Sequence, residues 1–146
     1  MQKRVNITQR EPQALSAMMG LETYLSNVTI STTLKNFIKI RASQINGCAY
    51  CIDMHSKEAL EKGETNRRIF LLSAWREAGA VFSEEEKLVL TITEEITLIN
   101  REGLSDQTYE KALALFSENQ IAEIVMSVIG INAWNRIAIS SRYQLA

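Results

Sequence analysis

Proline occurs only once in this chain of 146 residues, at Pro12, and a chain so poor in proline has few ways to fold. Because proline breaks helices and marks turns, its absence after position 12 permits long helices, whereas a many-turned β-protein would need more turn residues. The single proline falls in the first turn of a helix expected over residues 11–26, where its missing N–H does little harm. The chain is therefore predicted to be all-α.

Start and stop signals divide the chain into about seven helices. Ser83 and Ser117 each begin a capping box, in which the serine oxygen accepts from an early backbone N–H and a Glu or Gln side chain reaches back to the cap. Gly63 is expected to end a helix in the left-handed conformation. Apolar residues recur at spacings of three and four between these signals. The expected helices cover residues 11–26, 32–43, 48–62, 66–78, 83–101, 105–116 and 117–143.

The length is typical of one domain, and with no linker or repeat we expect a single domain over residues 1–146. The formal net charge of −1 gives no electrostatic attraction to nucleic acid or to an anionic membrane. The N-terminal segment lacks the apolar stretch of a signal peptide. The longest apolar-rich run, residues 69–75, is far shorter than the ~20 residues of a membrane span. We expect a cytoplasmic protein without nucleic-acid or membrane partners.

The last expected helix, residues 117–143, is apolar on more than one side. Such a helix either lies at the centre of a domain or is buried in a subunit contact, and both interpretations stay open. Trp134 is expected to anchor the core or an interface. Asn135 and Arg136 are expected either near the functional site or at a subunit contact.

Both cysteines and the only histidine lie within the stretch NGCAYCIDMH, residues 46–55. If residues 48–62 are helical, Cys48, Cys51 and His55 fall within roughly 60° of one another around the helix axis. The Asn-Gly turn signal directly before Cys48 places the dithiol in the first turn, where unpaired N–H groups and the helix dipole favour a thiolate. In a reducing compartment such a pair is more often catalytic or metal-binding than structural.

The same three residues admit other interpretations. The cysteines could be small buried apolar residues, and the histidine a hydrogen-bonded structural residue. A metal site is conceivable, but structural zinc takes four protein ligands, and the fourth would have to be Asp53, a distant carboxylate or water. Covalent haem needs a histidine directly after the second cysteine, where this chain has Ile52. A redox dithiol with a neighbouring base fits the pattern best.

The stretch RASQINGCAYCIDMHSKEAL, residues 41–60, resembles the carboxymuconolactone decarboxylase superfamily, and within it the alkylhydroperoxidase AhpD-like branch. The signature of that branch is cysteine, two residues, cysteine, three residues, histidine. Residues 74–79, 82–87 and 131–142 resemble it as well. The resemblance implies an AhpD-like helical fold that assembles into homo-oligomers, commonly trimers or hexamers, and that needs no metal or tightly bound cofactor.

The resemblance further implies an antioxidant oxidoreductase, a thiol-dependent reductase of organic hydroperoxides or hydrogen peroxide. The second cysteine, here Cys51, would attack the peroxide and become a sulfenic acid, and Cys48 would then close a disulfide with it. An external thiol or protein reductant would reopen the pair. The helix terminus alone favours Cys48 as the more acidic thiol. We assign the attack to Cys51 because of the resemblance and because His55 stands four residues after it.

Two positions depart from the best-studied AhpD-type members. Those have a relay glutamate twelve residues before the first cysteine and a histidine just before the second, where this chain has Asn36 and Tyr50. Neither is a good base near neutral pH, so His55 is the remaining base and weaker peroxidase activity is expected than a full relay would give. Glu58 could orient the imidazole, although a solvated surface charge is the commoner role for such a residue.

Two further functions compete with the peroxidase. A carboxymuconolactone-type lactone decarboxylase belongs to the other arm of the superfamily, but its chemistry does not need a cysteine pair. A non-enzymatic redox-sensing module would change its assembly or partner affinity when the disulfide forms. An apolar wall of Phe37, Ile40 and Ile52 would suit an organic hydroperoxide, unless these residues belong to the core.

Overall fold

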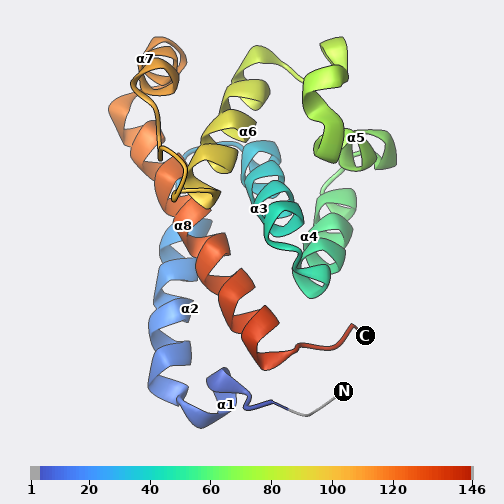
Figure 1. The fold of residues 1–146 in the computed structure, drawn as a ribbon, viewed down its shortest axis with the longest axis vertical. Coiled ribbons are helices and arrows are strands. Elements are labelled where there is room, and N and C mark those ends of the chain that lie inside the picture. The colour runs from blue at the N-terminus through green and yellow to red at the C-terminus, as the bar shows by residue number, and fades with distance from the viewer. Residues whose placement is uncertain (1–3, 146) are drawn as a thin grey trace.

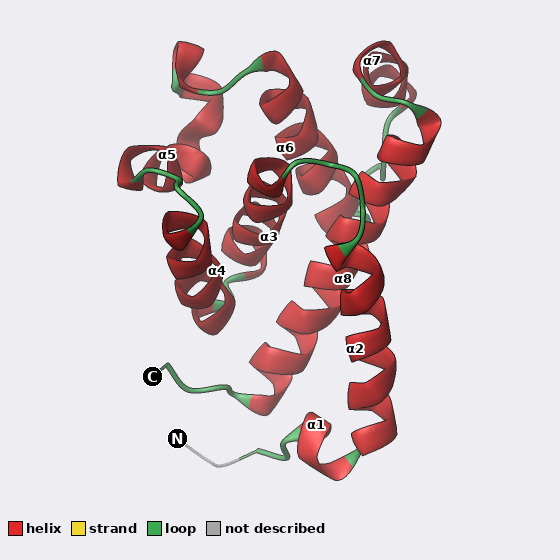
Figure 2. Cartoon of the chain, turned by 180° about the vertical axis from the view of Figure 1, so that it is seen from behind, coloured by secondary structure: helices red, strands yellow, loops and turns green. Residues whose placement is uncertain are grey.

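The computed structural model describes residues 4–145, and within that range every regular element is helical (Figures 1 and 2). The predicted all-α fold is confirmed. Eight α-helices and two short 3₁₀ helices follow one another along the described chain. They are α1 (Ile7–Arg10), α2 (Pro12–Ser26), α3 (Thr32–Asn46), α4 (Ala49–Glu61), α5 (Asn66–Leu71), η1 (Leu72–Glu77), η2 (Gly79–Val81), α6 (Glu84–Thr97), α7 (Asp106–Leu115) and α8 (Glu118–Ser141).

Local capping explains where α6 and α8 begin. Ser83 and Ser117 each accept a hydrogen bond from the backbone N–H three residues later. The side chains of Glu86 and Gln120 return hydrogen bonds to the serine backbone, so both predicted capping boxes are confirmed. Each box satisfies two backbone donors that the first turn of a helix leaves unpaired.

The predicted helix over residues 66–78 is wrong in its second half. α5 ends at Leu71, and the following 3₁₀ helix contains Ala74 in a non-helical conformation, with φ −126° and ψ 31°. After this break Trp75 is buried, and its indole N–H donates to the carboxylate of Glu94 in α6. A tertiary contact has thus overridden the local helical pattern. Among the other ends, α3 runs three residues further than predicted and α6 stops at Thr97 rather than near residue 101.

Helix α3 forms the centre of the fold and packs against α4, α6 and α8, as Figure 2 shows. Its side chains Phe37, Ile38 and Ile40 are fully buried. Phe37 and Ile40 belong to one core cluster with Phe82 and Leu90, whereas Ile38 belongs to a second cluster shared with α8. The connection from α3 to α4 is a single tight turn, so the beginning of α4 is held directly against this core.

The 24-residue α8 runs diagonally through the molecule and packs against α3, α6 and α2 (Figure 1). Gly130 permits the close approach of α2, because a Cβ atom there would lie 2.6 Å from Cδ1 of Leu25. Of the two interpretations of this apolar helix, the core interpretation holds for the face that carries Ile124 and Val128, whereas Ile129 and Ile139 are exposed. Across residues 4–145, no helix combines the length and the hydropathy needed to cross a membrane.

Candidate active site

The two cysteines lie at the first turn of α4 and are joined by a disulfide. Gly47 ends α3 in the left-handed conformation, with φ 69°, which glycine adopts without strain. Cys48 is the N-cap of α4, and its sulfur accepts from the backbone N–H of Cys51 at 3.4 Å. The predicted position of the pair at a helix N-terminus is confirmed. In the dithiol form the same backbone donors would stabilise a thiolate at this turn.

A network of side-chain amides fixes the turn before the cysteines to α8. Asn46 donates to the side-chain oxygens of Asn132 and Asn135, at 3.0 and 2.9 Å. Asn135 is almost fully buried and donates in turn to the hydroxyl of Ser43 at 3.0 Å. Of the two places expected for Asn135, the structure therefore shows the one beside the candidate site. Arg136 is exposed and donates to Asn132.

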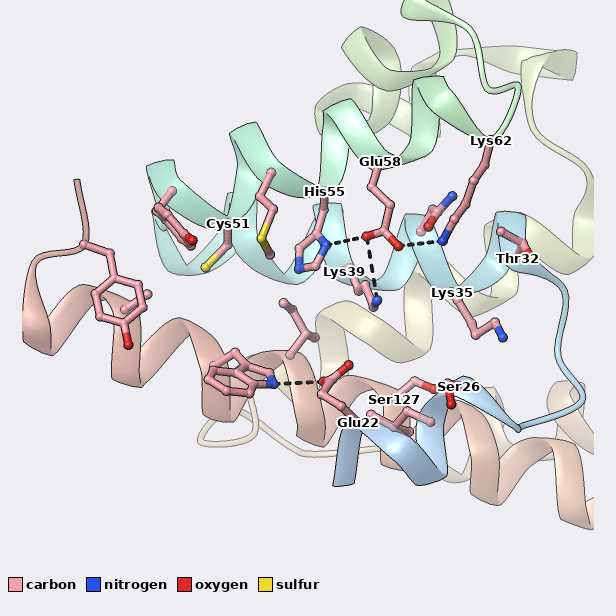
Figure 3. A pocket seen from close by; sticks show the side chains of 18 residues that line it. Glu22, Ser26, Thr32, Lys35, Lys39, Cys51, His55, Glu58, Lys62 and Ser127 are labelled. Atoms are coloured by element: carbon pink, nitrogen blue, oxygen red, sulfur yellow. Dashed lines mark hydrogen bonds and ion pairs between the residues drawn. The ribbon is translucent and has the colours of Figure 1, made fainter. Parts of the chain in front are cut away.

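His55 lies one turn after Cys51 on the same helix and is 7% exposed. Its Nδ1 atom lies 3.1 Å from Oε2 of Glu58, and Glu58 also accepts from Nζ of Lys62 at 2.5 Å and lies 3.9 Å from Nζ of Lys39 (Figure 3). Glu58 is thus not an isolated surface charge. The structure shows the alternative arrangement, in which this carboxylate holds the imidazole.

The two ionisable groups of this contact both have perturbed pKa values. Burial lowers the pKa of His55 below 6.5, although the hydrogen bond to Glu58 opposes the change. Burial by itself would raise the pKa of Glu58, but the hydrogen bonds from Lys62 and His55 outweigh it and lower the pKa to about 2. At neutral pH the imidazole is therefore neutral and the carboxylate ionised. Because an ionised carboxylate only accepts, Nδ1 carries the proton and Nε2 is free to accept one.

A cavity of about 630 Å³ lies between α3 and α4 on one side and α2 and α8 on the other. Cys51 and His55 both line it, whereas Cys48 does not. The volume is typical of sites for small organic ligands. Figure 3 shows Cys51 at one end of the cavity, His55 and Glu58 in the middle, and Thr32, Lys35 and Lys62 at the other end. The arrangement gives one cysteine, with a neighbouring imidazole, contact with a partly open cavity.

The two positions that depart from the AhpD-type pattern also line the cavity. Asn36 is 3% exposed, and within residues 4–145 its side-chain amide has no hydrogen-bond partner. Tyr50 packs edge-on against Tyr143, with ring centroids 5.3 Å apart. The hydroxyl of Tyr143 lies 3.0 Å from Oγ1 of Thr8, which ties the end of the chain to its beginning.

The apolar wall of the cavity differs from the expected one. Phe37 and Ile40 are core residues and, like Ile52, do not line the cavity. The apolar lining comes instead mostly from α2 and α8, which local sequence patterns could not bring to this place. It consists of Leu25, Met54, Ile131, Trp134 and Ala138. Among the described residues, no group of three or more His, Cys, Asp or Glu side chains is placed to hold a metal ion.

Comparisons with known proteins agree with this architecture. The model of the carboxymuconolactone decarboxylase family matches residues 12–95. The uncharacterized protein YdfG of Bacillus subtilis (strain 168) is 41% identical over 140 residues, which cover 96% of this chain and 95% of that protein. A crystal structure from Agrobacterium tumefaciens, of a protein of unknown function suggested to be the antioxidant defence protein AhpD, is 38% identical. It has a TM-score of 0.94 and the match covers 99% of both chains.

A more distant structure shares the fold alone. An uncharacterized peroxidase-related protein from Silicibacter sp. TM1040 is 19% identical, with a TM-score of 0.81 over 92% of this chain and 71% of that one. The helical arrangement is thus retained where the sequence is largely different.

Proposed function

Because the chain belongs to the carboxymuconolactone decarboxylase family, we propose that it reduces organic hydroperoxides through a dithiol cycle of Cys51 and Cys48, assisted by His55. The observation that carries the proposal is that Cys51 and His55 line the same cavity while Cys48 is already bonded to Cys51 behind it. The similarity to the Agrobacterium tumefaciens protein that was suggested to be the antioxidant defence protein AhpD supports this proposal.

The proposed cycle begins with the reduced pair. The Cys51 thiolate attacks the outer peroxide oxygen, the O–O bond breaks, and the alkoxide leaves and takes up a proton to become an alcohol. The Cys48 thiolate then attacks the sulfenic sulfur of Cys51, forms the disulfide and releases water. An external dithiol exchanges with this disulfide, becomes oxidised itself and restores both thiols. A cytoplasmic location would supply such reductants.

His55 acts in this proposal as the base for the Cys51 thiol. Its neutral imidazole keeps Nε2 available for a proton, while Glu58 holds Nδ1. Because burial lowers its pKa, His55 carries no charge at neutral pH and can accept the thiol proton. Asn36 and Tyr50 add no second base near neutral pH. We therefore propose a slower peroxide reaction than a complete proton relay would support.

Thiol counting tests the proposal directly. The reduced protein is alkylated and weighed before and after one equivalent of cumene hydroperoxide, beside Cys51→Ser. The expected result, seen only in the wild type, is that both thiols are lost to alkylation and that the mass of the unalkylated protein falls by two hydrogen atoms. Two thiols that stay free over minutes would overturn the proposal. Disulfide formation without turnover, together with a change in assembly measured by size exclusion, would indicate a redox sensor instead.

The family name gives a second candidate, a lactone decarboxylase. That chemistry removes a carboxyl group and does not require two thiols. The variant with both Cys48→Ser and Cys51→Ser separates the candidates, because it would keep a decarboxylase activity and lose a dithiol peroxidase activity. Carbon dioxide release from a carboxymuconolactone by this variant would favour the second candidate.

A further inference from the structure

The cavity beside Cys51 has two chemically different ends, and the far end is positively charged. Three lysines, Lys35, Lys39 and Lys62, line the cavity together with two glutamates, Glu22 and Glu58. The lining therefore carries one positive charge in excess. Figure 3 shows Lys35 and Lys62 at the end opposite Cys51.

The lysines are not equivalent, because two of them face the same carboxylate, that of Glu58. Lys62 donates to Oε1 of Glu58, and Lys39 lies 3.9 Å from Oε2. Within residues 4–145 no carboxylate pairs with Lys35, which is half-buried. Glu22 accepts instead from the indole N–H of Trp134 at 2.8 Å. Lys35 is thus the lining lysine whose charge has no carboxylate partner among the described residues.

Next to Lys35 in the sequence, Asn36 presents a second group without a partner. Its side chain is 97% buried by accessible area, lines the cavity, and has no hydrogen bond within the described residues. The polar atoms of this amide are not themselves fully enclosed, so they face the cavity, where water can reach them. A ligand in the cavity that accepts from the amide would supply the missing partner.

Resting on the proposed function, we infer that the substrate is a long-chain hydroperoxide that carries a carboxylate, such as a fatty-acid hydroperoxide. The carboxylate lies between the ammonium of Lys35 and the amide of Asn36, the alkyl chain lies along Leu25, Ile131 and Trp134, and the peroxide meets Cys51.

The geometry sets the length of this substrate. Cys51 in α4 and Lys62, the C-cap of that helix, are eleven residues apart, about 16 Å along the helix at 1.5 Å per residue. Lys35 lies at the same end as Lys62 (Figure 3). A short carboxylate peroxide cannot reach both Lys35 and Cys51, whereas a long acyl chain can. The cycle is the one given above: the fatty-acid hydroperoxide is reduced to the hydroxy acid and water, and the two thiols are oxidised to the disulfide.

The test compares three peroxides in a single turnover, so that no external reductant is needed. Rapid quenching and mass spectrometry give the rate constants of disulfide formation with linoleic acid hydroperoxide, its methyl ester and cumene hydroperoxide, each below its micelle concentration. We expect the acid to react about tenfold faster than the ester, as a charged hydrogen bond implies. Lys35→Met should abolish this preference and leave the ester and cumene hydroperoxide rates unchanged within about twofold.

Lys57→Met is the matched control, because Lys57 is exposed, pairs with Asp53 and does not line the cavity. It removes the same charge from the protein and should keep the preference for the acid. Asn36→Leu, which removes the amide at similar volume, should lower the rate with the acid more than the rate with the ester. Thermal melting of each variant confirms that it is folded.

A binding measurement separates this inference from the proposed function. Oleate, which has no peroxide, is titrated into the disulfide form by calorimetry, and Lys35→Met should weaken its binding about tenfold while Lys57→Met does not. Equal rates for acid and ester, with oleate binding unaffected by Lys35→Met, would overturn the inference while the peroxidase stands. If none of the three peroxides oxidises Cys51, the proposed function fails, and the oleate titration alone decides whether the carboxylate site exists.

Discussion

Two glutamates of this protein, Glu58 and Glu94, are surrounded by hydrogen-bond donors in a similar way. Glu94 accepts from Nε of Arg41 at 2.9 Å, from the indole N–H of Trp75 at 2.8 Å and from Arg76 at 2.5 Å. Glu58 meets His55, Lys62 and Lys39. Burial opposes ionisation of both carboxyls, yet the donors lower the pKa of each.

The donors of the two clusters differ. Those around Glu94 are arginines and an indole, none of which changes its charge near neutral pH, and they join α3, α6 and η1. The cluster around Glu58 contains an imidazole that does titrate and that faces the cavity beside Cys51. Donors of fixed charge make a structural tie, whereas one titratable donor beside a reactive thiol can take part in chemistry.

The largest expected effect is on stability at the structural tie. Glu94→Ala should lower the free energy of unfolding by about 3 kcal/mol, because it leaves the charge of Arg41 and the buried N–H of Trp75 without their acceptor. Urea denaturation of the reduced protein measures this, with the exposed Glu102→Ala as control. A loss below about 1 kcal/mol would contradict a structural role, since that is the value expected of an exposed pair.

The second effect is on rate at the other cluster. Glu58→Gln should slow disulfide formation with cumene hydroperoxide about tenfold, part of what a positioned base contributes, because the imidazole loses its anionic partner. The free energy of unfolding should change by less than about 1 kcal/mol, since Glu58 is about a third exposed. Glu61→Gln, an exposed glutamate three residues further along α4, is the control. If Glu58→Gln lowered the free energy of unfolding but left the rate unchanged, the cluster around Glu58 would be structural, like the one around Glu94.

The third effect is a shift in the pH dependence of that rate. Because burial lowers the pKa of His55, the imidazole should become protonated and inactive as a base only below pH 6.5. The rate should therefore fall on the acid side of that value. Glu58→Gln removes the negative charge that raises this pKa and leaves at most a neutral hydrogen bond, so its acid limb should lie at lower pH than in the wild type. Superimposable limbs, measured in rapid-quench experiments from about pH 5 to pH 8, would show that His55 is not the group observed.

The same His55 pKa affects stability with a defined sign. A histidine whose pKa is lower in the folded state than in the unfolded state binds fewer protons when folded. Its contribution to stability is therefore complete above the unfolded value of 6.5 and is lost as the pH falls through the folded pKa. Glu94, whose pKa is lowered from 4.5, keeps its contribution above that value and loses it only as the pH falls through the lowered folded-state pKa.

What the sequence could predict follows from the range of the interactions involved. Capping boxes at Ser83 and Ser117 depend on residues three apart, and the placement of Cys48, Cys51 and His55 depends on the period of one helix, so both were within reach. The contact of Glu58 with His55 also lies within one helix. The sequence alone nevertheless favoured a solvated glutamate. Water and an imidazole can both pair with this carboxylate, and the spacing does not distinguish between them.

The remaining features depend on packing between distant segments. The bond of Asn46 to Asn135 and the cavity wall supplied by Leu25 and Trp134 arise only when α2 and α8 meet α3 and α4. The break at Ala74 likewise accompanies the bond of Trp75 to Glu94, which local propensity does not contain. These positions lie far apart in the chain, so no short-range pattern predicts their contacts.

The smallest expected effect distinguishes the donors around Glu94 from one another. Arg76 is 57% exposed, so Arg76→Met should lower the free energy of unfolding by only about 0.5 kcal/mol. Arg41 is 17% exposed and also donates to Gln44, so Arg41→Met should cost several times more in the same urea titration. If the two losses were equal, the exposed arginine would be as important as the buried one, and the tie would depend on total charge rather than on buried hydrogen bonds. A larger loss of unfolding free energy for Arg41→Met than for Arg76→Met would assign the tie to the buried donor. Buried hydrogen bonds would then be what separates Glu94 from the more exposed Glu58.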